Sequence, residues 1–504
     1  MVTLSPRQCF WGVLAATLAF RLWLAGALPM TPDEAYFVLW GRHPALGYYD
    51  HPPMVGWLLT PFAAISEAAW WVRLPSVLLP AMLAFLVRGA LAGPLRRDGD
   101  AEGLADLAGI AVLLLPANVW NVLITTDTPL ALFSVASMLA FARKRFFVAG
   151  VLLGLAFLSK YFAVLLGLGY LAWALAARRP RAIVLVLAGA VPFGLVNLWW
   201  NWQNCWCNVM FNAINRNEDA ALGWVNPVLY LLSLAYLAGP LLWIAVRERR
   251  AIRASLVRGE ASALFAAWLV PFLIFAAVSI GKRVGLHWML SFLPALVLTV
   301  ALAAGRPALG SALRWLAPIA VLHGLFALSL WMIPIETWKA PIERWAKPGT
   351  YEKLKRDWVM LSDPHAVLDP LGPQLVRYRL TTFNYAMAAE LSYDTARRVP
   401  VFGTGSSHAR QDDIATDWRR FDGEDLMILL REPPDLERYR PFFHAVEAMA
   451  VPARGTLHYA VLGRGFDYAA YRERVLREID ERWYRIPSWL PRGRCFFFER
   501  YGFG

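Results

Sequence analysis

The chain has 504 residues, of which 58% are hydrophobic and only 17% are charged, against about 25% charged residues in soluble domains. This composition excludes an ordinary soluble protein and predicts a membrane protein. The formal net charge of +13 does not indicate nucleic-acid binding, because the basic residues lie mainly in short connectors between apolar runs, where they set membrane orientation.

Apolar stretches near the ~20 residues that cross a bilayer recur through the first two thirds of the chain. They lie at about 10–28, 70–92, 107–124, 128–142, 147–160, 162–177, 182–200, 225–246, 262–280, 287–304 and 312–333. The predicted fold class is therefore a polytopic α-helical membrane protein with about eleven transmembrane helices. Because Arg21 interrupts the first stretch, we expect a retained signal anchor there and not a cleaved signal peptide.

The basic residues of alternate connectors predict the orientation of these helices. They are Arg96, Arg97, Arg143, Lys144, Arg145, Arg178, Arg179, Arg181, Arg247, Arg249, Arg250, Arg253 and Arg258. The positive-inside rule places them in the cytoplasm. The other connectors are at about 29–69, 118–127, 201–224 and 281–286, and they face outside together with everything after residue 334.

The sequence predicts a transmembrane domain of residues 1–333, with an external catalytic loop at about 29–69, and a soluble periplasmic α/β domain of residues 334–504. In the soluble domain, β-rich runs and helical stretches alternate. The β-rich runs are Val399–Phe402, Leu426–Leu430, His458–Leu462 and Cys495–Phe498, and the helical stretches are Tyr385–Arg397 and Tyr468–Trp483. The Gly/Ser-rich loop Gly403–His408 is either an ordinary turn or a cradle for a phosphate or glycan. Because it lacks the spacing of a phosphate-binding fingerprint, the turn is the favoured interpretation.

The four cysteines, Cys9, Cys205, Cys207 and Cys495, do not predict a disulfide framework. Cys205 and Cys207 are too close for an unstrained bridge in regular structure. We expect free thiols packed as small apolar groups. The spacing of Cys and His residues does not match a metal site.

Two acids follow the first apolar stretch directly, in Thr31-Pro32-Asp33-Glu34. Capping of a short helix explains one carboxylate, because an acid is favourable at a helix N-terminus. It explains two carboxylates less well. In a functional interpretation, one carboxylate accepts the proton of an acceptor hydroxyl. The other carboxylate then orients the first one or a substrate.

A second motif, Gly47–Met54, contains Tyr48, Tyr49, Asp50 and His51 followed by two prolines. A packed interfacial turn with tyrosines at headgroup depth explains this pattern without function. The alternative is a binding site in which Asp50 and His51 contact a polar or anionic ligand.

Further ionisable residues lie inside or at the edges of apolar stretches, where such groups are costly and usually pair or bind something. They are Asp127, Lys160, Lys282, Arg283 and His287. Asp127 could N-cap the next helix, a role open to Thr126 too, and it could also be an acid at the mouth of a cavity, since a capping acid there also faces substrate. Lys282 and Arg283 either snorkel to the interface or, as cations on the basic-poor side, bind an anion such as a lipid-linked phosphate.

Together these motifs resemble the bacterial branch of the protein-mannosyltransferase-like, C-type glycosyltransferases, which also contains lipid A aminoarabinose and galacturonosyl transferases. The resemblance covers about residues 10–300. It is carried in chain order by Asp33–Tyr36, Gly47–Pro53, Thr125–Pro129, Gly154–Lys160 and Asn197–Trp206. It implies a fold of many transmembrane helices and transfer of a sugar, with inversion, from a polyprenyl phosphate carrier to an acceptor outside the cytoplasm.

The resemblance also implies roles for single residues. Asp33 would be the catalytic carboxylate, with Glu34 as its neighbour. Asp127 would be a second acid facing the cavity, and Lys160 and Lys282 would lie near the carrier phosphate.

One departure from the aminoarabinose branch concerns His51. In that branch a lysine stands at this position, whereas a histidine supplies charge only when it is protonated. We therefore expect binding of the carrier phosphate to depend more on Lys160, Lys282 and Arg283. The identity of the sugar is not predicted.

The sequence thus predicts an inverting glycosyltransferase of a bacterial inner membrane, with its active site on the periplasmic side. Its predicted partners are a polyprenyl-phosphate-linked sugar and the hydroxyl of an envelope lipid, glycan or protein. Asp33 and Glu34 are the predicted catalytic residues. The predicted substrate-binding residues are Tyr48, Tyr49, Asp50, His51, Asp127, Lys160, Lys282, Arg283 and His287.

No cofactor or metal site is predicted, although the external acids and His51 include ligand types that bind divalent ions. The alternative function is a lipid or sugar transporter or flippase without transferase activity. A transporter predicts symmetric halves and acids near the bilayer midplane, and the sequence has neither.

Overall fold

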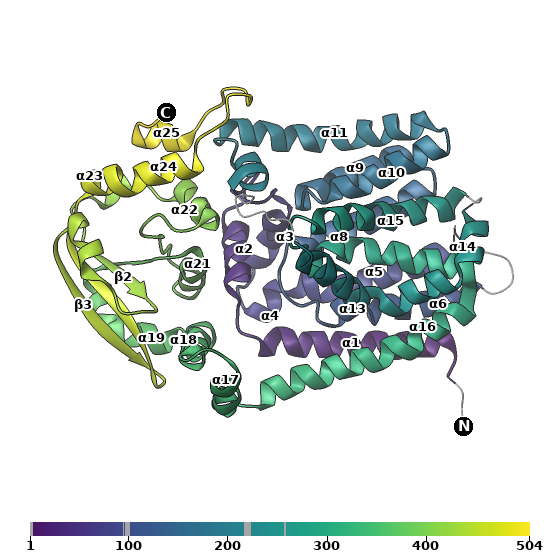
Figure 1. Cartoon of the computed structure of the whole chain (residues 1–504), viewed down its shortest axis with the longest axis horizontal. Coiled ribbons are helices and arrows are strands. Elements are labelled where there is room, and N and C mark those ends of the chain that lie inside the picture. Colours follow the sequence, from purple (N-terminus) through teal and green to yellow (C-terminus); the bar gives the residue numbers. More distant parts are fainter. Residues whose placement is uncertain (1–3, 94, 96–100, 216–222, 257–258) are drawn as a thin grey trace. The chain divides into compact units, whose positions relative to one another are not determined.

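The computed structural model describes residues 4–93, 95, 101–215, 223–256 and 259–504 (Figure 1). Contacts divide the chain into two compact units. The membrane unit comprises Met1–Leu28, Pro52–Asn197 and Asp219–Leu330, and the α/β unit comprises Pro29–His51, Leu198–Glu218 and Trp331–Gly504. Arg96, Arg97 and Arg258, which the sequence predicts to be cytoplasmic, lie outside the described residues.

Long apolar helices build the membrane unit. They are α1 Pro6–Ala27, α5 Leu74–Ala92, α6 Ala101–Leu113, α8 Asp127–Ala142, α9 Phe146–Ser159, α10 Ala163–Ala176, α11 Pro180–Gln203, α13 Val225–Arg247, α15 Gly259–Ser279 and α16 Leu293–Met332. Shorter helices lie between them: α3 Met54–Ala63, α4 Ala69–Val72, α7 Pro116–Val119 and α14 Arg249–Ser255. Among the described residues, six spans are long and apolar enough to cross a membrane, which supports a multi-pass membrane protein. The count of about eleven spans stays a prediction.

Helix α16 contains a break at Gly305, where φ is 70° and ψ is −164°. A residue with a Cβ adopts such a conformation only with strain, whereas glycine adopts it readily. The sequence predicted two separate spans here, at about 287–304 and 312–333. The break separates the two predicted spans without an intervening loop.

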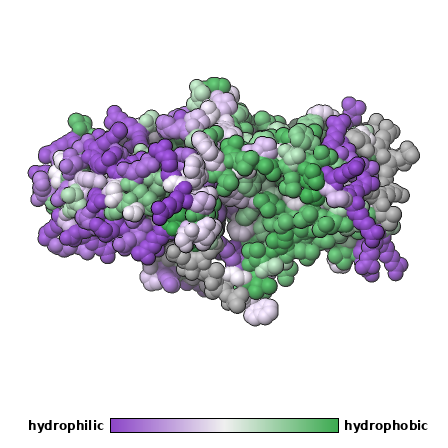
Figure 2. Space-filling view, turned by 90° about the horizontal axis from the view of Figure 1, so that it is seen from above, coloured by the Kyte–Doolittle hydropathy of each residue, from purple (hydrophilic) through white to green (hydrophobic). Residues whose placement is uncertain are grey.

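The outside of the membrane unit is apolar. Figure 2 shows a broad hydrophobic surface over these helices. Among the exposed side chains of α13 and α16 are Leu231, Trp243, Val321 and Leu322, each more than 60% accessible. In a protein dissolved in water such a surface would be unfavourable, but in a bilayer it faces lipid.

A four-stranded sheet with the order β1-β2-β4-β3 forms the centre of the α/β unit. The strands are β1 Arg379–Thr382, β2 Leu426–Leu430, β3 Phe443–Ala453 and β4 Thr456–Phe466. Strands β1 and β2 pair in parallel, and the other pairs are antiparallel. The turn between β3 and β4 has positive φ at Arg454 (43°) and Gly455 (71°), as expected of a tight two-residue hairpin.

Helices from distant parts of the chain complete this unit. They are α2 Pro32–Arg42, α12 Cys207–Val209, α17 Lys339–Trp345, α18 Thr350–Ser362, α19 His365–Leu368, α20 Gly372–Arg377, α21 Tyr385–Asp394, α22 Arg410–Ala415, α23 Tyr468–Tyr471, α24 Arg477–Trp483 and α25 Phe496–Tyr501. The predicted runs Leu426–Leu430 and His458–Leu462 are confirmed as strand, and Val399–Phe402 contributes only an isolated bridge from Val401 to Thr382.

The predicted β-run Cys495–Phe498 is wrong, because this segment enters helix α25. Its consecutive aromatic residues suggested a strand by composition. In the structure, Phe497 and Tyr501 lie four residues apart on the buried face of the helix, and the Phe497 ring stacks on Tyr484 with centroids 4.3 Å apart. The helical spacing of the buried pair therefore outweighs the local β-propensity.

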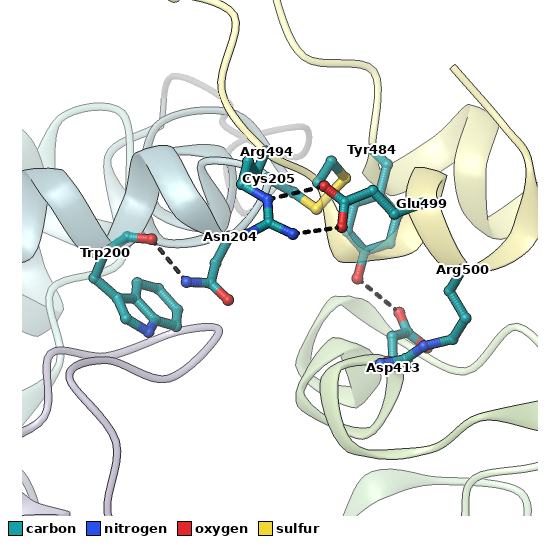
Figure 3. Close-up of a disulfide and its surroundings, with 9 residues drawn as sticks. Trp200, Asn204, Cys205, Asp413, Tyr484, Arg494, Glu499 and Arg500 are labelled. Carbon is teal, nitrogen blue, oxygen red and sulfur yellow. Dashed lines mark hydrogen bonds and ion pairs between the residues drawn. A yellow bond between two sulfur atoms is a disulfide. The ribbon is translucent and has the colours of Figure 1, made fainter.

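Cys205 and Cys495 form a disulfide across 290 residues of sequence (Figure 3). The expectation of four free thiols is wrong for this pair, while Cys9 and Cys207 are free. The spacing argument considered only neighbours in sequence. Backbone hydrogen bonds from Cys205 N to Arg494 O and from Arg494 N to Trp202 O, each 2.9 Å, hold the two segments together.

We expect Cys205→Ser to lower the free energy of unfolding of the α/β unit by about 2–4 kcal/mol, because the crosslink restricts the unfolded chain. Thermal melting of the purified full-length protein measures this loss. Cys495→Ser should match it, and the double variant should lose no more than either single variant. Additive losses from the two substitutions would contradict a shared bond.

Candidate functional site

The acidic pair begins helix α2, and the two carboxylates have different surroundings. Thr31 is the N-cap: its hydroxyl accepts from Glu34 N at 3.4 Å, and Glu34 Oε2 accepts from Thr31 N at 3.1 Å. This reciprocal pairing is a capping box, with Pro32 in the first helical turn. Glu34 is buried, whereas Asp33 is exposed. Helix capping therefore accounts for Glu34 and leaves Asp33 accessible to a reactant.

The second motif is a loop whose aromatic side chains pack tightly. The Tyr48 ring stacks on Trp40 with centroids 4.1 Å apart, and its hydroxyl donates to Trp40 O at 3.0 Å. The Gly47 backbone lies directly against the Trp200 ring, so a Cβ at this position would clash with it. These contacts confirm a packed turn, with Tyr48, Tyr49 and Asp50 all buried and His51 half-buried.

Three asparagines of the segment after α11 hold this loop by its backbone and by Tyr49. Asn208 Nδ2 donates to the carbonyl oxygens of Tyr48, Tyr49 (3.0 Å) and His51 (3.5 Å). Asn212 Nδ2 donates to Asp50 O at 3.4 Å, and Asn215 Nδ2 donates to the Tyr49 hydroxyl at 2.9 Å. Asn208 lies in the short helix α12, and Asn212 and Asn215 lie in the π-helix Met210–Asn215 that follows it.

We expect Asn208→Asp to lower the stability of the loop by about 2–3 kcal/mol, because the new carboxylate lacks an N–H donor and lies buried against carbonyl oxygens. Thermal melting and transfer activity should both fall. Asn204→Asp is the matched control, since Asn204 Nδ2 donates to a single carbonyl, Trp200 O, at 2.9 Å in a less buried place. Equal effects of the two substitutions would contradict the role of Asn208.

Two tyrosines each donate a hydrogen bond to a predicted site carboxylate, one to Asp50 of the loop and the other to Asp33 of helix α2. Tyr36 Oη donates to Asp50 Oδ1 at 3.4 Å, and Tyr385 Oη donates to Asp33 Oδ1 at 3.3 Å. Burial raises the pKa of Tyr36 and of Tyr385, and the nearby carboxylates raise them further. Both phenols therefore keep their protons near neutral pH and act as donors.

Asp127 and Lys160 form an ion pair inside the membrane unit. Lys160 Nζ lies 2.8 Å from Asp127 Oδ2 and 2.9 Å from Oδ1, and both residues are less than 10% exposed. Asp127 lies in the first turn of α8, where the N-cap residue Thr126 makes no side-chain cap hydrogen bond. Lys160 ends α9 as its C-cap. The attraction between the two groups therefore offsets the free-energy cost of burying both charges.

Aromatic side chains connect Lys160 with the segment that contains the predicted residues Lys282, Arg283 and His287. Lys160 Nζ lies 5.2 Å from the centroid of the Phe162 ring, which packs on Trp288 at 4.5 Å. Trp288 belongs to a 3-10 helix, Leu286–Phe292, which packs on α8 and also carries the exposed His287. In the connector before it, Lys282 is half-buried and Arg283 is exposed.

The predicted residues thus divide between the two units. The α/β unit holds Asp33, Glu34, Tyr48, Tyr49, Asp50 and His51, and the membrane unit holds Asp127, Lys160, Lys282, Arg283 and His287. Among the described residues, three or more His, Cys, Asp or Glu side chains nowhere gather as a metal site. The loop Gly403–His408 has positive φ at Gly403 and Gly405, which fits turn chemistry, and His408 stacks on Tyr385 with centroids 5.3 Å apart.

The sequence did not predict that Asn208, Asn212 and Asn215 bind the Tyr48–His51 loop, or that Tyr385 donates to Asp33. A spacing of polar residues at 208, 212 and 215 was visible, but its partners lie about 160 residues away. No local signal links Tyr385 to Asp33, which is 352 residues distant in sequence.

Known proteins share both sequence and fold with this chain. Residues 50–202 match the family described as dolichyl-phosphate-mannose-protein mannosyltransferase. A lipid A galacturonosyltransferase, RgtD of Rhizobium johnstonii, is 31% identical over 222 residues, which are 40% of this chain and 45% of that protein. The chain therefore matches less than half the length of this curated relative.

Among solved structures, ArnT from Cupriavidus metallidurans bound to undecaprenyl phosphate has a TM-score of 0.62 at 16% identity. The match covers 89% of this chain and 97% of that one. The apo structure of the same protein gives a TM-score of 0.59 at 15% identity. At this identity the match demonstrates a shared fold. The chain thus has an ArnT-like fold, and its residues 50–202 are similar to the protein mannosyltransferase family.

Proposed function

We propose that this protein is an inverting glycosyltransferase that moves a sugar from a polyprenyl phosphate carrier to a hydroxyl acceptor. The proposal rests on the different surroundings of the two acids, Asp33 and Glu34. Glu34 is buried in the capping box, and the adjacent Asp33 is exposed and accepts a hydrogen bond from Tyr385. A helix terminus that needed only a cap would not require the second acid.

The proposed reaction requires one base. The Asp33 carboxylate accepts the proton of the acceptor hydroxyl, whose oxygen bonds to the anomeric carbon. The bond from that carbon to the carrier phosphate breaks on the opposite face, so the configuration inverts and polyprenyl phosphate leaves with the electron pair. Cations that stabilise the phosphate are the remaining requirement, and Lys160, Lys282 and Arg283 are the proposed set.

The acceptor and donor are proposed from the chemistry of the relatives. RgtD is a lipid A galacturonosyltransferase and the ArnT structure holds undecaprenyl phosphate. We therefore propose a uronic acid or another sugar on a polyprenyl phosphate as donor, and lipid A or another envelope lipid as acceptor. Tyr48, Tyr49, Asp50, His51, Asp127 and His287 complete the proposed substrate-binding set.

We also propose a bacterial inner membrane as the location, with the α/β unit on the periplasmic side. The Cys205–Cys495 disulfide supports this side, because disulfides persist in oxidising compartments such as the periplasm.

Mass spectrometry of envelope lipids from cells with and without this protein tests the proposal. We expect a lipid species that carries an added sugar to disappear in its absence. The purified protein should then form that species from polyprenyl phosphate galacturonic acid and lipid A, or from another carrier-linked sugar that matches the missing mass. Identical lipid and glycan profiles in both strains, with no turnover by the purified protein, would exclude a transferase and favour the transporter alternative.

A further inference from the structure

The α/β unit brings helices α2 and α21 together although they are far apart in sequence (Figure 1). The two helices have nearly equal lengths, Pro32–Arg42 and Tyr385–Asp394. At their N-terminal ends Tyr385 Oη lies 3.3 Å from Asp33 Oδ1. At their C-terminal ends Arg42 Nη1 donates to Ser392 O at 3.1 Å, and Arg42 Nη2 donates to Tyr393 O at 3.3 Å. The helices therefore run side by side in the same direction.

One hydrogen bond joins the first turns of the two helices. Asp33 lies in the first turn of α2, and Tyr385 is the first residue of α21, whose N-cap is Asn384. Helix N-termini carry partial positive charge and favour an anion. Arg42 binds the last carbonyl oxygens of α21 and holds the pair in register.

The Tyr385 ring is itself fixed on two sides. It stacks on His408, with centroids 5.3 Å apart and planes 23° apart, and it meets the edge of Tyr36 at 5.9 Å. His408 packs in turn against Phe211 at 5.2 Å. A ring held in this way presents its hydroxyl in one direction, so little rotational entropy is lost when the hydrogen bond forms.

We propose that Tyr385 is a positioning residue for Asp33, by which the C-terminal domain completes the catalytic site. The inference depends on the proposed role of Asp33 as the base. The phenol donates to one carboxylate oxygen, so the carboxylate cannot rotate freely and its other oxygen is directed to the acceptor hydroxyl. Burial and the adjacent acids raise the pKa of Tyr385, so the phenol stays protonated across the working pH range.

Tyr385→Phe tests this proposal, because it removes the hydroxyl and keeps the stacked ring. We expect kcat to fall about tenfold with the donor KM nearly unchanged, since a hydrogen bond to a charged group is lost at the reacting centre and not at the carrier. The kcat–pH profile should change as well, because the hydrogen bond is lost at the proposed base, whereas a loss of packing alone would leave the profile unchanged.

Tyr468→Phe is the matched control. Tyr468 is likewise half-buried and is the first residue of a helix, α23, behind an acidic N-cap, Asp467. Turnover, KM and the pH profile should stay at wild-type values in this variant. The assay uses the full-length protein with polyprenyl phosphate galacturonic acid and lipid A, and in cells the lipid species that depends on the protein.

Asp33→Asn separates the two possible failures. If Asp33→Asn is inactive while Tyr385→Phe keeps the wild-type kcat and pH profile, the positioning role is wrong and the proposed function stands. If Asp33→Asn retains activity, the proposed base is wrong and the inference fails with it. A melting temperature of Tyr385→Phe well below that of Tyr468→Phe, with an unchanged pH profile, would assign Tyr385 a merely structural role.

Discussion

Asp33→Asn is expected to reduce sugar transfer by about 10³-fold or more while the protein still inserts and folds. The amide is nearly the same size as the carboxylate, and the side chain is exposed, so little packing is lost. Tyr385 can still donate to the amide oxygen. Only the capacity to take the proton of the acceptor hydroxyl is removed. The measurement is single-turnover transfer by the purified variant, with a melting curve to confirm folding.

Glu34→Gln is the control for the neighbouring acid. A glutamine can also accept from the N-cap residue in a capping box, so helix α2 should begin at the same place. We expect transfer to fall by no more than about tenfold, because Glu34 acts through the backbone around Asp33. An active Asp33→Asn together with an inactive Glu34→Gln would reverse the two roles.

Substitution of one partner in the Asp127–Lys160 pair is expected to have the second large effect. Asp127→Asn leaves the Lys160 ammonium buried without a counter-ion, and Lys160→Met leaves the carboxylate in the same condition. Each should destabilise the membrane unit by about 3–5 kcal/mol, because a buried charge that has lost its partner is costly. Thermal unfolding in detergent measures this loss, and transfer should fall with it.

The double variant Asp127→Asn/Lys160→Met distinguishes structure from chemistry. With both charges removed, the desolvation cost disappears and much of the stability should return. Transfer should stay at least about 100-fold low if Lys160 stabilises the carrier phosphate as proposed. Recovery of both stability and transfer would show that the pair has only a structural role.

A second ion pair in the membrane unit provides the matched control. Arg88 Nε of α5 lies 2.6 Å from Asp106 Oδ1 of α6, and Asp106 is buried. Single substitutions there should also reduce stability. The double variant Arg88→Met/Asp106→Asn should recover both stability and transfer, because this pair has no proposed role in the reaction.

The membrane helices could be predicted well from the sequence because their signal is local. Most predicted spans coincide with an apolar helix or part of one, from α1 through the two segments of α16 that meet at Gly305. The span predicted at about 107–124 is wrong in its second half, because α6 ends at Leu113 and only the short helix α7 follows before residue 124. Hydropathy over ~20 consecutive residues decides whether a segment is favourable in lipid, and distant residues change that balance little.

The acidic motif was predictable only in part. The pattern Thr31-Pro32-Asp33-Glu34 contains both a capping box and a candidate base, and the resemblance to known transferases assigns the base to Asp33. The structure adds the different surroundings of the two acids, since Glu34 is buried and reciprocally bonded to Thr31 whereas Asp33 is exposed. Their roles in transfer stay a prediction. The pairing of Asp127 with Lys160 likewise needed the positions of α8 and α9.

Composition and short sequence patterns were sufficient to predict the membrane class, the approximate spans and the residues with reactive side chains. Tertiary structure alone decided that Cys205 bonds to Cys495, that Asn208 holds the Tyr48–His51 loop, and that Tyr385 donates to Asp33. Each of these contacts joins residues at least 157 positions apart in the chain. Such contacts depend on how whole elements pack, and no local propensity encodes which distant partner a side chain meets.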